Sequence, residues 1–320
     1  PCQELKPNYL TNLKSIAYPQ TNNKIDYLGL LPKSNWHESI SKKWDPGETM
    51  GHQTLQRFLK KGIKQYTNGR DYPALNAVSR ISPHLHFGEL SPKRIWRELS
   101  TASQNWEIGP QIEHFQRELA WREFSYSLLY HFPNLTESNL NKCFDTFPWT
   151  KNRDSLAKWQ HGQTGFPLID AGMRELWQTG YMHNRIRMIV ASFLVKNLLI
   201  HWQIGARWFW DCLVDADLAN NTCSWQWVAG CGADASPYFR IFNPVTQSQK
   251  FDANADYIKT YVPELSNCPA KYVHDPSSAP EAKLKNFGIK LGVDYPKAIV
   301  DLQSTRKESL NAYQTMRTAN

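Results

Sequence analysis

Apolar residues along most of this chain recur three or four positions apart, which is the period of an amphipathic α-helix. The first clear case after about residue 46 is formed by Leu55, Phe58, Leu59 and Ile63. Longer segments with the same period follow at residues 112–129, 168–177, 186–199 and 206–218. The alternation that marks β-strands is nearly absent, so the pattern predicts an all-α fold.

The first 45 residues differ from the rest of the chain. They are rich in Pro, Asn, Lys and Ser and carry only short apolar pieces without a sustained period. Such a composition is typical of linkers. We therefore predict two parts, a linker or wrapping segment at residues 1–45 and a helical domain at residues 46–320.

Composition places the chain among globular proteins, because 41% of its 320 residues are hydrophobic and its charges are mixed. Its six cysteines form no CxxC pair, which argues against zinc and iron–sulfur sites and fits reduced thiols in an intracellular protein. No apolar run reaches the roughly 18 residues that a membrane span needs. We expect a cytoplasmic monomer that contacts no membrane and binds no metal.

Charge and aromatic content narrow the possible partners. The formal net charge is +8 and the pI is about 9.1, which suggests an anionic partner, nucleic acid first. A basic surface that only confers solubility is the alternative. With 13 residues, Trp is nearly as frequent as Tyr or Phe, which makes tryptophan the outlier of the composition.

Four stretches combine polar and aromatic side chains in patterns that suggest a ligand. The first comprises residues 66–71 and 78–88, where serines and arginines lead into a capped helix start that could bind a phosphate. Ordinary helix capping is the alternative. The second is residues 118–124, where Glu118 and Trp121 share one helix face. A helix with a solvated charged edge and a core tryptophan would show the same spacing.

The third stretch, residues 180–188, places three cationic or amide side chains at the start of an otherwise apolar helix, where buried polar groups need partners. The fourth, at 215–227 and 232–244, is dense in acidic, amide and aromatic residues. A packed aromatic core with turns is the alternative. No GxGxxG or GxxxxGKS motif occurs, so the sequence indicates neither a Rossmann nor a P-loop nucleotide site.

Together these stretches resemble the FAD-binding helical domain of the photolyase and cryptochrome family over residues 46–315. Within that family the sequence is most similar to the class I cyclobutane-pyrimidine-dimer photolyases of bacteria. The resemblance implies an all-α domain that holds FAD in a bent conformation in a central cavity. Family members also have an N-terminal α/β antenna domain, whereas this chain begins in what resembles the linker after it. We therefore expect the antenna domain to be absent and no antenna chromophore on this chain.

Matching the family position by position implies a segment that holds the FAD diphosphate. This segment comprises Tyr66, Val78, Ser79, Arg80, Ile81 and Ser82. Family members often have Thr where Val78 stands. Backbone N–H groups would then replace the hydroxyl contact at that position.

The resemblance also implies the residues around the flavin ring. Arg187 and Asp215 match an ion pair beside the isoalloxazine, and Asn184 and Asp217 match neighbouring cofactor contacts. Asn221 matches the residue that faces flavin N5, where plant cryptochromes have an Asp. An amide can hydrogen-bond the reduced ring without adding negative charge, so Asn221 favours a reduced flavin and hence repair.

The same matching implies a pocket for a flipped-out pyrimidine dimer. Trp121 and Trp227 match its aromatic walls, and Glu118 matches the carboxyl group that hydrogen-bonds the dimer. The other matched contacts to the dimer or its flanking phosphates are Arg70, Asn184, Arg185, Met188 and Gln247. Photolyases are among the enzymes known to extrude their target base, and a dimer that pairs and stacks poorly is the least costly to extrude.

Three tryptophans, Trp225, Trp202 and Trp149, match the chain that carries electrons from the surface to photoexcited flavin. The resemblance thus implies light-driven repair of cyclobutane pyrimidine dimers in DNA by electron transfer from excited, reduced FAD. A cryptochrome-like blue-light photoreceptor is the main alternative. A six-four photolyase is less favoured, because the pocket motif supplies the single histidine His183. A helical DNA-binding protein without flavin is a further alternative.

Overall fold

A computed structural model describes residues 28–30, 32–102 and 108–319. In these ranges the chain is helical, with two isolated β-bridges and no extended strand, so the predicted all-α fold is confirmed. Residues 39–320 form one compact unit. The linker expected at residues 1–45 lies mostly outside the described residues and stays a prediction.

The first half of the chain contains helices of very different lengths. They are η2 (Asn35–His37), α1 (Glu38–Ser41), α2 (Glu48–Lys60), η3 (Gly62–Gln65), α3 (Tyr66–Gly69), α4 (Ser82–His86), α5 (Pro92–Ala102), α6 (Gly109–His131), η4 (Pro133–Thr136), η5 (Lys142–Thr146) and α7 (Arg153–Gln160). The second half continues with α8 (Pro167–Thr179), α9 (Asn184–Ser192), the π-helical turn η6 (Phe193–Asn197), α10 (Trp202–Cys212), α11 (Leu218–Ala229), α12 (Pro244–Phe251), α13 (Asp256–Tyr261), η7 (Pro263–Leu265), α14 (Ala270–Val273), η8 (Pro276–Ser278), α15 (Glu281–Asn286) and α16 (Leu302–Ala319).

Local sequence explains where several of these helices begin and end. The Asn243 side chain accepts a hydrogen bond from Val245 N at 2.9 Å and so caps the start of α12. Helix α8 ends at Gly180, whose φ of 65° is in the left-handed region that favours glycine. A Cβ on Gly180 would also lie 2.6 Å from Val214 Cγ1, so the chain needs glycine there for space as well.

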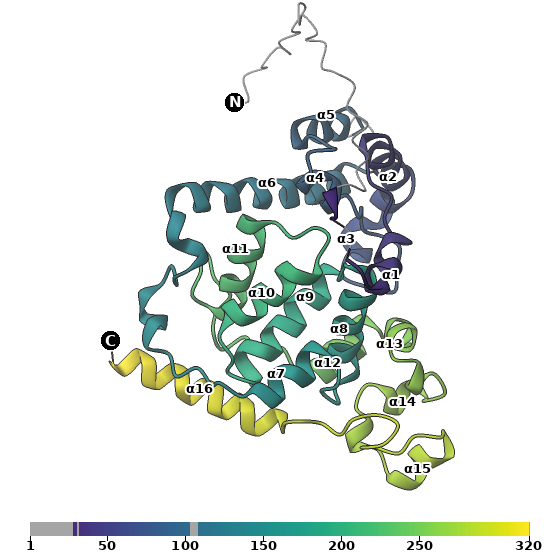
Figure 1. Cartoon of the computed structure of the whole chain (residues 1–320), viewed down its shortest axis with the longest axis vertical. Helices are drawn as coiled ribbons and strands as arrows, with labels where there is room; N and C mark the ends of the chain where they lie inside the picture. The colour runs from purple at the N-terminus through teal and green to yellow at the C-terminus, as the bar shows by residue number, and fades with distance from the viewer. Residues whose placement is uncertain (1–27, 31, 103–107, 320) are drawn as a thin grey trace, which may run out of the picture. The chain divides into compact units, whose positions relative to one another are not determined.

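Two hydrophobic clusters form the core of the helical unit. The larger joins α7 to α11 with α13 and α16 and contains the buried rings of Trp159, Phe193, Trp202 and Trp225. The smaller joins α2, α5 and α6. In Figure 1, α9, α10 and α11 lie between α6 and α16.

Gly205 on α10 packs against the ring of Trp225 on α11. A Cβ on this residue would be 2.2 Å from Trp225 Cη2 and 2.6 Å from Leu194 Cδ2. Both neighbours are buried in the larger cluster, so a Cβ at this position would overpack the core. The glycine therefore sets the position of the Trp225 ring.

We expect Gly205→Ala to lower the free energy of unfolding by about 1–3 kcal/mol, the usual cost of an overpacked core. Chemical denaturation measures this change. Gly109→Ala is the matched control, because nothing lies within 4 Å of a Cβ at Gly109. If the Gly205 variant and the unaltered protein had the same free energy of unfolding, α10 and α11 could move apart without loss of stability.

Candidate active site

A cavity of about 690 Å³ lies among α4, α6, α9 and α11. This volume is in the range of small-molecule sites, roughly 300–1,000 Å³. Every residue expected to hold the cofactor borders it, namely Tyr66, Val78, Ser79, Arg80, Ile81, Ser82, Asn184, Arg187, Asp215, Asp217 and Asn221. The packing of the helices thus collects side chains that lie far apart in the sequence around one space.

Most of the residues expected to contact a dimer border the same cavity. They are Arg70, Glu118, Trp121, Asn184, Met188 and Trp227. Arg185 and Gln247 are not among its lining residues. Arg185 Nη2 instead lies 2.7 Å from Asp71 Oδ2, and its guanidinium carbon lies 4.5 Å from the ring centroid of Phe251. The roles expected for these two residues therefore stay predictions.

Arg80 is a strained part of the cavity wall. Its φ of 54° is in the left-handed region, which costs a non-glycine residue about 1–3 kcal/mol and is typical of functional sites. Its guanidinium carbon lies 4.8 Å from the ring centroid of the buried Tyr181, and that of Arg187 lies 5.3 Å from the same ring. Together with the neighbouring hydroxyls of Ser79 and Ser82, the guanidinium of Arg80 provides the donors that a phosphate group needs.

Arg187 forms a fixed ion pair with Asp215. Its Nη2 lies 3.0 and 2.9 Å from the two carboxylate oxygens of Asp215, and its Nε donates to Met182 O at 2.7 Å. Burial lowers the pKa of Arg187, but Asp215 and Tyr181 outweigh this effect and raise it. The guanidinium therefore stays charged beside the cavity.

Asp217 is the centre of a polar cluster that the sequence did not reveal. It caps α11 by accepting hydrogen bonds from Asn220 N at 2.9 Å and Asn220 Nδ2 at 2.7 Å. The hydroxyl of Tyr126 donates to its Oδ2, and His86 Nδ1 lies 3.6 Å from the same oxygen. Burial raises the pKa of Asp217, but the hydrogen bonds from Asn220 and Tyr126 lower this pKa by more than burial raises it. The carboxylate is therefore ionised. Tyr126 lies 91 positions from Asp217, so no local pattern could have linked the two residues.

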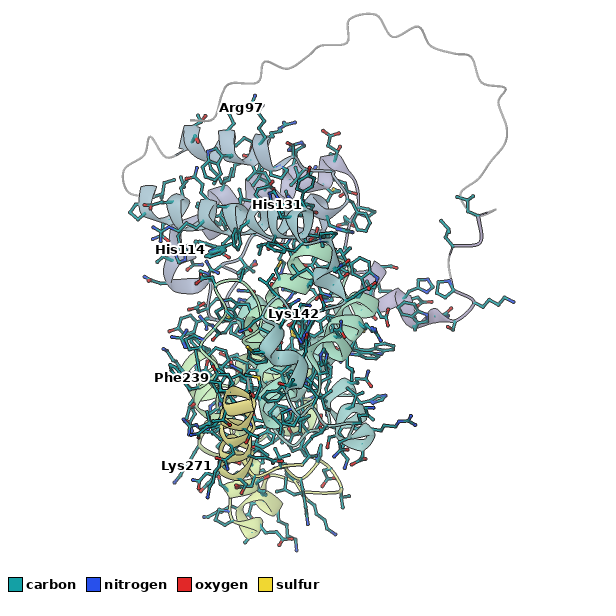
Figure 2. The ribbon with its side chains drawn as sticks, turned by 90° about the vertical axis from the view of Figure 1, so that its left-hand side faces the viewer. Arg97, His114, His131, Lys142, Phe239 and Lys271 are labelled. Carbon is teal, nitrogen blue, oxygen red and sulfur yellow. The ribbon has the colours of Figure 1, made fainter. Side chains whose placement is uncertain are left out.

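Glu118 contacts Arg70 at another part of the cavity wall. An oxygen of Glu118 accepts a hydrogen bond from Arg70 Nη1, and the same nitrogen lies 3.0 Å from His114 Nε2. Figure 2 labels His114 on this part of α6. One turn further along, Trp121 borders the cavity and is 52% exposed, so its ring is open to a large ligand.

The three expected electron carriers differ in their surroundings. Trp225 borders the cavity and is buried. Trp202 is buried away from it, and its Nε1 donates to Asn139 Oδ1 at 2.8 Å. Trp149 is partly buried and contacts the larger core cluster. The structure thus places one of the three at the cavity wall and the other two in the body of the unit.

Asn221, the residue expected to face the flavin, also has a defined orientation. Its Nδ2 donates to Ala206 O at 2.9 Å. The side-chain oxygen therefore remains as an acceptor at the cavity wall. Over the described ranges, no group of three or more His, Cys, Asp or Glu residues is placed to hold a metal ion. None of the described helices is long and apolar enough to cross a membrane.

Comparison with known proteins identifies the family. A family model described as the FAD binding domain of DNA photolyase matches residues 115–315. The deoxyribodipyrimidine photo-lyase of Agrobacterium fabrum is 48% identical over 308 residues, which are 95% of this chain and 64% of that protein. The crystal structure of a bacterial class III photolyase from Agrobacterium tumefaciens aligns with a TM-score of 0.90 at 48% identity and covers 95% of this chain and 64% of that one. A Synechocystis cryptochrome aligns with a TM-score of 0.82 at 34% identity, covering 94% and 61% of the two chains.

The chain therefore belongs to the photolyase/cryptochrome family and contains its FAD-binding domain. It spans 64% of the length of the Agrobacterium relatives. The sequence was expected to be most similar to class I enzymes, whereas the solved Agrobacterium structure is described as a class III photolyase.

Proposed function

We propose that this chain binds FAD in the cavity and, with the flavin reduced, uses light to repair cyclobutane pyrimidine dimers in DNA. One observation carries the proposal: a single cavity is bordered both by the expected cofactor residues and by Glu118, Trp121 and Trp227, which the resemblance assigns to the dimer. The names of the Agrobacterium relatives support the same chemistry.

The residues around the cavity fit FAD by their chemistry. Arg80, Ser79 and Ser82 provide charged and hydroxyl donors for a diphosphate. The Arg187–Asp215 ion pair and the free acceptor oxygen of Asn221 suit a polar ring edge that carries N–H groups. When bound and reduced, FAD supplies the excited electron donor, while the protein positions it and controls the local charge.

The remaining side chains would hold the substrate. The rings of Trp121 and Trp227 offer faces on which a flipped-out dimer can stack, and each such contact contributes about 1–3 kcal/mol. Glu118 would exchange its contact with Arg70 for a hydrogen bond to the dimer. The +8 net charge adds attraction for the phosphate backbone that does not depend on sequence.

The test is illumination of the chemically reduced protein with an oligonucleotide that contains one thymine dimer. We expect the dimer to be lost and two thymines restored only in the light, with an action spectrum that follows the absorption of the reduced flavin. A flavin-containing protein that leaves the dimer intact would contradict the proposal. Material without flavin absorbance would contradict the cofactor assignment itself.

A cryptochrome-like photoreceptor is the second candidate, because a Synechocystis cryptochrome shares the fold at 34% identity. Asn221 argues for repair, since an aspartate at this position would add a second negative charge beside a reduced ring. The same illumination experiment separates the two functions. Photochemistry of the flavin without loss of the dimer would favour the photoreceptor.

A further inference from the structure

The ring of His201 is in contact with both outer tryptophans of the expected electron path. The centroid of its imidazole ring is 5.0 Å from the ring centroid of Trp149 and 5.6 Å from that of Trp202. No pattern in the sequence assigned this histidine a role. Its ring therefore contacts Trp149 and Trp202, which are 53 positions apart along the chain.

The backbone holds all three rings in place. Thr150 N donates to Leu199 O at 2.7 Å and Thr150 Oγ1 donates to Leu198 O at 2.8 Å, which ties the segment of Trp149 to the segment just before His201. His201 itself caps α10, because its Nδ1 accepts a hydrogen bond from Gln203 N at 3.2 Å. The contact with both tryptophans is therefore a built feature of the fold.

The imidazole of His201 is kept neutral. Burial lowers its pKa below the ordinary value of 6.5, and the nearby charge of Arg207 on α10 lowers it further. Asp145 on η5 opposes this shift. The accepting lone pair on Nδ1 requires the same uncharged form.

A positive charge at His201 would disfavour a positive charge on either of the two neighbouring tryptophans. A tryptophan that has given up an electron is a cation as long as its Nε1 keeps its proton. Among the residues that the structure describes, none accepts a hydrogen bond from the buried Trp149 Nε1, so no neighbouring base takes this proton. An imidazolium about 5 Å away would repel such a cation, and in a partly buried site this repulsion is only weakly screened.

We propose that His201 is a positioning residue of the electron path, whose neutral ring links Trp202 to Trp149 and whose protonation interrupts the path. This inference rests on the proposed flavin photochemistry. With FAD bound, one electron would pass from Trp225 to the excited flavin. Trp202 would then reduce Trp225, and Trp149 would reduce Trp202. A thiol reductant in solution restores Trp149, releasing one proton to water, and two of the resulting thiyl radicals combine to a disulfide.

The test compares two substitutions at this position. His201→Asn keeps a neutral capping side chain without the ring, and His201→Lys introduces a permanent cation. The readouts are the rate of flavin photoreduction with a thiol reductant and the yield of tryptophan radicals by transient absorption. We expect His201→Lys to lower both by on the order of tenfold or more, because a unit charge at this distance in a partly buried site opposes the arrival of a positive charge on Trp202 and Trp149. His201→Asn should lower both by a smaller factor.

The pH profile provides a second measurement on the same samples. In the unaltered protein, the yield of tryptophan radicals measured without the thiol should be constant above about pH 7 and should fall as the pH drops below the range in which histidine is neutral. His201→Asn should lack this acid limb. His131→Lys is the matched control, because His131 is exposed at the end of α6 (Figure 2) and should leave the rate unchanged.

Two outcomes would overturn the inference. One is photoreduction by His201→Lys at the rate of the unaltered protein, and the other is an acid limb that His201→Asn retains. Dimer repair by dithionite-reduced protein is measured in parallel. If that repair fails in the unaltered protein, the proposed function is wrong, while the dependence of photoreduction on residue 201 is still decided by the first two measurements.

Discussion

Replacing Arg187 with glutamine is expected to remove most of the bound flavin and to lower the free energy of unfolding by about 3–5 kcal/mol. The side chain of Asp215 is only 4% exposed, so without its partner the carboxylate is buried and uncompensated. The cavity also loses a guanidinium that would face the cofactor. Flavin absorbance per protein and chemical denaturation measure the two effects.

A double variant separates the loss of stability from the loss of flavin. Arg187→Gln combined with Asp215→Asn removes both charges of this pair, so stability should recover while flavin stays low. Arg117→Gln is the control for loss of an ion pair alone, because Arg117 and Glu113 are 64% and 66% exposed and such pairs contribute at most about 1 kcal/mol. Full flavin content in Arg187→Gln would show that the Arg187–Asp215 pair does not hold the cofactor.

Glu118→Ala is expected to lower the rate of dimer repair by about 10²–10³-fold while the protein keeps its FAD. Glu118 borders the cavity, and its carboxylate is oriented by Arg70. A group that stabilises charge developing on the substrate acts mainly in the transition state, so its loss lowers the rate of the chemical step. Single-turnover repair of a dimer-containing oligonucleotide by reduced protein measures that rate.

Glu113→Ala provides the matched control for this variant. Glu113 lies on the same helix, but its side chain is 66% exposed and pairs with Arg117 on the surface. Repair by Glu113→Ala should equal that of the unaltered protein. Loss of FAD from Glu118→Ala would instead assign Glu118 to the cofactor, and unchanged repair would remove it from the site.

Tertiary packing also shows that the site is more polar than the sequence indicated. The ionised carboxylate of Asp217 receives hydrogen bonds from Asn220 and Tyr126 and lies close to His86. Both Tyr126 and His86 are ordinary residues of helical segments in the sequence, and neither was assigned a role there. Their meaning depends on the packing of α4 and α6 against the start of α11.

The sequence by itself determined the all-helical fold class and the family. Helical hydrogen bonds join residues four positions apart, so the spacing of apolar residues that predicts helices is readable locally. The motifs around Asp215 and Asn221 were specific enough to identify the FAD-binding domain, which the comparisons confirm. Only the tertiary structure decided which side chains meet across helices, because such contacts depend on the relative placement of whole helices. It engages Arg185 with Asp71 outside the cavity, joins Tyr126 to Asp217, and places His201 in contact with Trp149 and Trp202.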